Sequence, residues 1–97
     1  MKNTDVAELL YEIADYKEQE PFKARAYRRA ALVIEGLQED IEKVWGEKRL
    51  TELPGIGEGI AKKIEDFLKN DKSKYLEKIK KSTPVDMQGL RAVAGMG

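Results

Sequence analysis

The stretch that decides the fold runs Leu53-Pro54-Gly55-Ile56-Gly57-Glu58-Gly59-Ile60-Ala61-Lys62-Lys63-Ile64. It predicts a tight glycine-rich turn that opens an amphipathic helix. Glycine lets a backbone adopt positive φ and approach a ligand closely. The first amide groups of the helix have no partner within it and lie at the positive end of its dipole. The stretch is therefore typical of a phosphate-binding clamp made of main-chain amides.

The residue types in this turn have distinct expected roles. Pro54 presets one dihedral angle, and Gly55 and Gly57 leave no side chain between the amides and a phosphate. We expect Ile56 to anchor the turn in the core and Ala61 to let the preceding helix pack closely. Because such a turn suits phosphate groups, a nucleic-acid backbone is the expected ligand. Phosphate contacts position a protein without reading base sequence. A plain turn between two helices, with glycine caps, is the alternative.

The sequence predicts two helices at the start of the chain. Asn3 or Thr4 is expected to cap the first helix, and Pro21 to begin the second. Gly36 is placed to end that second helix. Its apolar stripe is expected to comprise Phe22, Ala26, Ala30, Val33, Ile34 and Leu37.

Further helices follow at apolar positions with helical spacing. A short one is expected around residues 39–45, a long one from the turn to about Asn70, and another capped by Ser73. A last segment begins at Thr83-Pro84. No alternating strand pattern is apparent. The sequence therefore predicts an all-α domain, a compact bundle of about five short helices.

The composition limits the classes of function. The chain has 97 residues, which suits one domain, and it contains no cysteine and no histidine. This excludes a disulfide framework, a zinc site built on thiolates or imidazoles, and a histidine-based catalytic triad. No apolar run reaches membrane-spanning length, and the N-terminus does not lead into a signal-peptide segment. We expect a cytoplasmic monomer, associated with the nucleoid if the source is prokaryotic.

Charge is strongly segregated although the formal net charge is zero. Residues 1–20 and 35–47 each sum to −4, whereas residues 21–34 and 48–81 each sum to +4. The two positive segments could bind a polyanion if they fold onto one side. Ordinary solvated helix faces are the alternative.

The two adjacent lysines of the long helix are predicted to differ. Lys62 falls almost opposite the apolar stripe and should be solvated, whereas Lys63 falls beside it. The stem of Lys63 can lie on apolar surface while its amine faces the ligand of the turn. Partial burial and neighbouring cations would favour a nucleophilic amine. The alternative is that Lys63 only contacts phosphate.

A second candidate phosphate contact lies on the helix that begins at Pro21. Lys23 and Tyr27 are four residues apart and therefore neighbours on one side. Their ammonium and hydroxyl groups could hold a terminal phosphate. A basic helix face with Tyr27 at the core boundary is the alternative.

The end of the chain repeats the pattern of the turn. Residues 93–97 have the form apolar, small, glycine, apolar, glycine, as residues 53–57 do. We infer that the chain is the N-terminal piece of a longer protein. A flexible glycine-containing tail is the alternative. The expected division is a helical domain over residues 1–83, with its hairpin motif at about 47–69, and the start of a second motif over 84–97.

On these residues the chain resembles the N-terminal domain of family X DNA polymerases, the DNA polymerase beta group. The likeness lies in residues 26–31, 33–34, 53–67, 76–79 and 90–97. In this resemblance the glycine turn is a helix–hairpin–helix motif, and residues 84–97 open a second one belonging to the polymerase domain. No palm carboxylates are present, so this piece is not expected to polymerise.

The resemblance implies a function in base excision repair. The domain would bind gapped or nicked DNA at the 5′-phosphate, and in many members it removes 5′-deoxyribose phosphate. The Schiff-base lysine of the family falls on Lys63, and its phosphate-contacting lysine and tyrosine fall on Lys23 and Tyr27. The expected DNA-binding residues are thus Phe22, Lys23, Tyr27, Gly55, Gly57, Gly59 and Lys62. A non-catalytic DNA-binding module and a protein-interaction domain are the alternatives.

The resemblance also implies a cation site and shows departures from the family. The backbone carbonyls of Thr51, Leu53 and Ile56 match those that hold Na⁺ or K⁺, and no other cofactor is expected. Gly59 and Thr51 stand where family members often have lysines. Phe22 replaces a histidine that stacks on a base, and its ring could still stack.

Overall fold

The computed structural model describes residues 2–82 of the 97-residue chain. The second motif predicted over residues 84–97 lies outside this range. The described part contains helices and no strand, which confirms the predicted all-α fold. Its elements are α1 (Asn3–Tyr16), α2 (Pro21–Glu35), α3 (Ile41–Gly46), the 3₁₀ helix η1 (Leu50–Glu52), α4 (Glu58–Asn70) and α5 (Lys74–Ser82).

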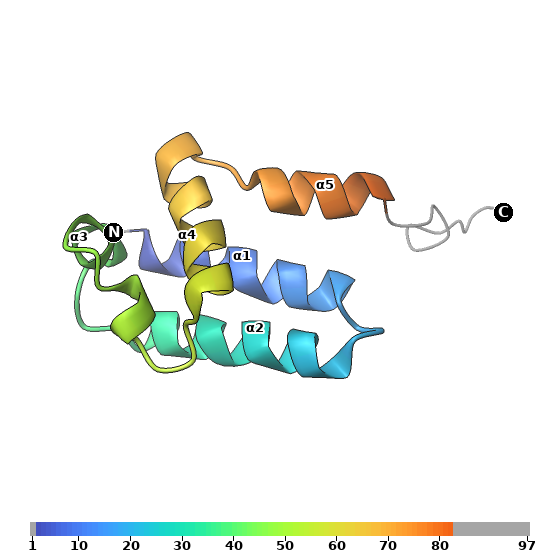
Figure 1. Cartoon of the computed structure of the whole chain (residues 1–97), viewed down its shortest axis with the longest axis horizontal. Coiled ribbons are helices and arrows are strands. Elements are labelled where there is room, and N and C mark those ends of the chain that lie inside the picture. The colour runs from blue at the N-terminus through green and yellow to red at the C-terminus, as the bar shows by residue number, and fades with distance from the viewer. Residues whose placement is uncertain (1, 83–97) are drawn as a thin grey trace, which may run out of the picture.

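The helices α1 and α2 lie side by side, and α4 runs across their direction. After a bend that follows α4, α5 lies alongside α1 (Figure 1). One apolar core joins all five helices, η1 and the turn. Its largest fully buried side chains are Val6, Leu10, Ile13, Ile34, Ile41, Val44 and Ile64. No helix among residues 2–82 has both the length and the apolar character needed to cross a membrane.

The start of α1 differs from the prediction. Asn3 is not a cap but the first helical residue, and it is buried. Its amide nitrogen donates to the Glu39 carbonyl at 2.7 Å, and its side-chain oxygen accepts from the Ile41 amide at 2.9 Å. Thr4 lies within the helix as well. The capping prediction was wrong because Asn3 satisfies backbone groups at the start of α3 instead of those of its own helix.

The buried face of α2 also differs from the prediction. Phe22 is 83% exposed and Ala26 is exposed. The residues that face the core are Ala24, Tyr27, Ala30, Ala31 and Ile34. Three alanines on this face let α1 approach closely, so the buried direction is set by the fit between two helices and not by side-chain size alone.

Most helix ends follow local sequence signals. Pro21 begins α2 and Gly36 ends it, as predicted. The Ser73 hydroxyl accepts from the Leu76 amide at 3.0 Å and caps α5, also as predicted. The helix α4 ends at Asn70, and Asp71 follows in the left-handed conformation with φ of 58°. These signals fix where α4 ends and where α5 begins, and so they position α5 beside α4.

Candidate nucleic-acid interface

The glycine turn, residues 53–57, has the geometry that its sequence predicts. The Leu53 carbonyl accepts a hydrogen bond from the Ile56 amide at 3.1 Å, and Gly55 has φ of +78°. Proline at the second position of a turn and positive φ at the third position are the features of a type II turn. A Cβ at Gly55 would meet only the Arg29 side chain, at an ordinary 3.7 Å. Backbone conformation, and not lack of space, therefore requires glycine at this position.

Ile56 and Gly57 connect the turn to α4. Ile56 is 3% exposed and packs into the core, as predicted. Gly57 has an extended backbone with φ of −85°, and a Cβ there would meet nothing within 4 Å. The backbone conformation of Gly57 is one that any residue can adopt. The absence of a side chain at this position therefore only leaves open space beside the backbone.

The start of α4 presents unpaired amides. Its first backbone hydrogen bond runs from the Ala61 amide to the Gly57 carbonyl at 2.9 Å. Within residues 2–82 no side chain caps this end. The amides of Glu58, Gly59 and Ile60 therefore lack helical partners and lie at the positive end of the helix dipole. A Cβ at Gly59 would likewise meet nothing within 4 Å, so the space beside this residue is open.

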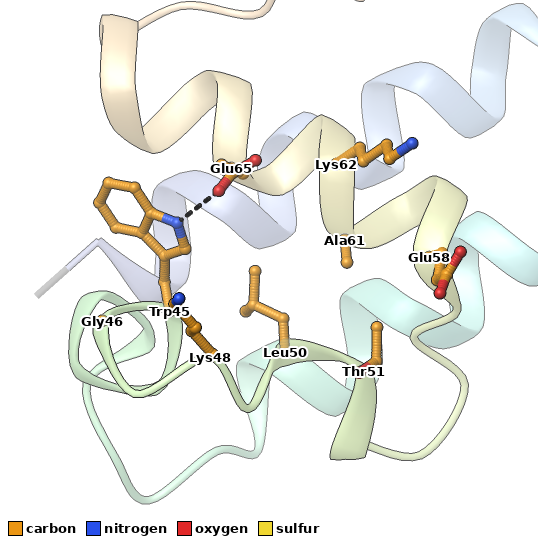
Figure 2. Close-up of a pocket in the computed structure, with 9 residues that line it drawn as sticks. All are labelled: Trp45, Gly46, Lys48, Leu50, Thr51, Glu58, Ala61, Lys62 and Glu65. Atoms are coloured by element: carbon orange, nitrogen blue, oxygen red, sulfur yellow. Dashed lines mark hydrogen bonds between the residues drawn. The ribbon is translucent and has the colours of Figure 1, made fainter.

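Lys62 is more exposed than Lys63, as predicted. Lys62 is exposed and lines an apolar pocket of about 580 Å³ between α3, η1 and α4. Figure 2 shows this pocket, with the Trp45 indole nitrogen donating to Glu65 at 3.0 Å along one wall. Lys63 is half-buried and does not line this pocket.

Lys63 lies against Tyr75 of α5. Its Nζ lies 4.5 Å from the centre of the Tyr75 ring and donates to the Gly59 carbonyl at 3.4 Å. Lys17, at the end of α1, places its Nζ 5.4 Å from the centre of the same ring. The interaction with Tyr75 also raises the pKa of Lys17. One tyrosine ring therefore holds two ammonium groups.

Tyr27 of α2 is a further neighbour of Tyr75. Its side chain is buried. Burial raises the pKa of Tyr27, and the neighbouring Tyr75 and the charge of Glu20 raise it further. The hydroxyl therefore stays protonated and can donate a hydrogen bond at neutral pH.

Glu20 bridges two lysines at the turn between α1 and α2. Its Oε1 lies 2.9 Å from Lys23 Nζ, and its Oε2 lies 3.5 Å from Lys17 Nζ. The hydrogen bond from Lys23 holds the pKa of Glu20 below its usual value, and Lys17 adds to this effect. We refer to Lys17, Glu20, Lys23, Tyr27, Lys63 and Tyr75 as the lysine–tyrosine cluster.

Sequence reasoning missed half of this cluster. Lys17 lies in an acidic segment, which hid its relation to the basic helix α2. Tyr75 fits the apolar spacing of α5, a pattern typical of a core residue, and it packs against the core. Lys17, Glu20 and Lys23 are spaced three residues apart, which is a usable signal for an ion-pair bridge within a helix. Here Lys17 and Glu20 lie in the connection between two helices, so the helical rule did not apply directly.

The remaining predicted contacts lie nearby. Phe22 exposes its ring, and the Arg25 guanidinium lies 5.9 Å from the ring centre. Arg29 lies beside Gly55, and Tyr27 contacts Tyr75. The two positive segments, residues 21–34 and 48–81, therefore meet in the folded domain.

A family model described as a helix-hairpin-helix domain matches residues 1–73. The chain belongs to this family. Over 100 residues it is also 32% identical to "DNA polymerase/3'-5' exonuclease PolX" of Bacillus subtilis (strain 168). The match covers 100% of this chain and 17% of that relative, in its N-terminal part. The resemblance to the N-terminal domain of family X polymerases is thereby confirmed.

Proposed function

We propose that this helix-hairpin-helix domain is the DNA-binding module of a family X DNA polymerase and holds gapped or nicked DNA at a 5′-phosphate. The observation that carries the proposal is the turn at Gly55, which delivers the uncapped start of α4 to an open surface. Similarity to a DNA polymerase supports DNA as the ligand. Because the turn binds through main-chain amides, it would accept any phosphodiester.

The lysine–tyrosine cluster would hold the end of the broken strand. Lys23 is exposed at the start of α2, and Phe22 beside it offers a ring on which a base can stack. An ammonium suits a terminal phosphate because the interaction is a charge-assisted hydrogen bond. The turn would then hold the continuous backbone and the cluster its 5′ end.

Lys63 would supply a lyase activity. Its amine attacks the C1′ aldehyde of a 5′-deoxyribose phosphate, and water leaves as the imine forms. Loss of a C2′ proton then breaks the C3′–O3′ bond and releases the strand with a 5′-phosphate. Hydrolysis of the imine returns the free amine. The half-buried position of Lys63 and the nearby Lys17 ammonium support this role.

A non-catalytic DNA-binding module is the second candidate. The observation that favours it is the contact of Lys63 with Tyr75, which must be broken before the amine reaches a sugar. Gly59 and Thr51 provide no cation where lysines are common in the family. These features weaken catalysis more than binding.

A monovalent cation would fit beside the turn. The hydrogen bond from Ile56 to Leu53 brings the backbones of these residues together, and the Leu53 carbonyl keeps a second lone pair. Carbonyl oxygens are ligands that hard cations prefer. The carbonyls of Thr51, Leu53 and Ile56 would hold Na⁺ or K⁺, which would help to neutralise a bound phosphodiester.

Borohydride trapping tests the lyase. The chain is incubated with a gapped duplex that ends in 5′-deoxyribose phosphate, and borohydride reduces any imine to a stable covalent link. We expect a trapped complex that Lys63→Ala abolishes and Lys69→Ala retains, since Lys69 is an exposed lysine at the far end of α4. No trapping, or trapping unchanged by Lys63→Ala, removes the catalytic claim and leaves the binding module.

Titration with DNA tests binding itself. Affinity should fall steeply with salt, because neutralised phosphates release counterions. A gapped duplex with a 5′-phosphate should bind more tightly than one with a 5′-hydroxyl. The amide resonances of residues 55–60 should shift during titration. Unmoved resonances at low salt would contradict the proposed use of the turn.

A further inference from the structure

We propose that Lys17 and Lys23 together form the terminal-phosphate site, and that the Glu20 carboxylate occupies this site until a 5′-phosphate displaces it. The inference rests on the proposed function and extends it by two residues, Lys17 and Glu20. It concerns the ligand class of phosphomonoesters at DNA ends.

The geometry of Glu20 is that of a bound anion. Its two oxygens bind two different ammonium groups, Lys23 at 2.9 Å and Lys17 at 3.5 Å. The lysines come from opposite sides of the break between α1 and α2, so the carboxylate joins two helices. A phosphomonoester has three acceptor oxygens and a charge of about −1.5 to −2 at pH 7. It can therefore take both ammonium groups and keep an oxygen for a further donor.

Lys17 is the pre-organised half of this pair. Its side chain is 17% exposed, whereas that of Lys23 is 63% exposed. The Tyr75 ring lies against the Lys17 ammonium, and the buried Tyr27 lies beside Tyr75. A cation already fixed in position loses less entropy when it binds an anion than a mobile one does.

Glu20 would weaken the binding of every phosphate at this site. As part of the same chain it competes with any ligand at high effective concentration. An internal phosphodiester carries one negative charge and gains little by replacing a carboxylate of equal charge. A terminal phosphate carries up to two charges and gains more. A terminal phosphate would thus displace the Glu20 carboxylate more completely than an internal phosphodiester would, and removal of the bridge should strengthen binding of the terminal phosphate.

Glu20→Gln tests the bridge, with Glu18→Gln as the matched control. Both variants remove one negative charge from the same connection, and only Glu20 bridges the lysines. Neither should disturb folding, since the Glu20 side chain caps no helix and the Ala24 amide bonds to its backbone carbonyl. Thermal melts by circular dichroism check this.

The measurement is the ratio of dissociation constants for 5′-hydroxyl and 5′-phosphorylated gapped duplexes. Glu20→Gln should raise this ratio about two- to fivefold over Glu18→Gln, the range of one or two surface ion pairs. Lys17→Gln should lower it by a similar factor, and Lys17→Arg should restore it because arginine keeps the charge.

The outcomes separate the two proposals. If the wild-type chain prefers the phosphorylated duplex and Glu20→Gln behaves like Glu18→Gln, the bridge is wrong and the proposed function stands. If no variant shows any preference, both fail. If the preference is seen only in Glu20→Gln, the bridge is supported and blocks the site more strongly than we expect. A ratio that Lys17→Gln leaves unchanged rules out Lys17 as a phosphate ligand.

Discussion

The glycine turn and the lysine–tyrosine cluster lie in one small domain but are built differently. The turn presents main-chain amides, positioned by the conformation of Gly55 and by the anchor Ile56. The cluster presents side chains that come together from α2, α4, α5 and the connection between α1 and α2. A backbone site therefore depends on a few consecutive residues, whereas a side-chain site depends on how helices pack.

The two constructions also suit different ligands. Amides carry no net charge and do not titrate, so the turn should bind internal phosphodiesters of any sequence. The cluster contains three lysines and one carboxylate, so its affinity should depend on the charge of the phosphate. Mutations that act on one region and spare the other can test this division.

Ile56→Ala should have the largest effect. Removing a buried isoleucine side chain costs about 2–5 kcal/mol of unfolding free energy, because a cavity remains. The loss is large for a domain of this size. Urea unfolding followed by circular dichroism measures it. Leu32→Ala is the control, since Leu32 is 61% exposed, and it should stay within about 0.5 kcal/mol. Equal losses would mean that Ile56 does not anchor the turn.

Gly55→Ala should destabilise the domain by about 1–2 kcal/mol, the cost of the left-handed conformation for a residue with a Cβ. Gly57→Ala should change stability far less, because its φ is −85° and the space around it is open. Thermal melts of both variants give the comparison. If Gly57→Ala is the more damaging of the two, the description of the turn is wrong.

Gly57→Ala and Lys23→Gln should affect DNA binding differently. A methyl group at Gly57 would stand where a phosphate approaches, so affinity should fall about fivefold for phosphorylated and unphosphorylated ends alike, on the order of one lost hydrogen bond. Lys23→Gln should weaken chiefly the phosphorylated duplex. Fluorescence anisotropy on the two duplexes distinguishes these results. If both variants weaken the two duplexes in the same proportion, the turn and the cluster do not bind different phosphates of the DNA.

Gly59→Ala should have the smallest effect and the opposite sign. Gly59 lies in the first turn of α4, and a Cβ there meets nothing within 4 Å. Alanine should therefore stabilise the helix by about 0.5–1 kcal/mol. An increased melting temperature with weaker DNA binding would show that Gly59 is kept for access to the amides.

Features that depend on neighbouring residues could be predicted from the sequence. Positive φ at Gly55, the start of α2 at Pro21 and the cap at Ser73 follow from local backbone chemistry. The separation of Lys62 from Lys63 follows from helical periodicity. Asn3 was misjudged because its partners are Glu39 and Ile41, about forty residues away. The exposure of Phe22 depends on where α1 packs against α2.

The sequence by itself determined the shape of the turn, because proline and glycine act on their own dihedral angles whatever surrounds them. It also determined that helices would form and where most of them would end. Only the tertiary structure decided that Lys17 and Lys63 share the Tyr75 ring. Contacts of this kind depend on the packing of helices distant in sequence, which no local pattern fixes.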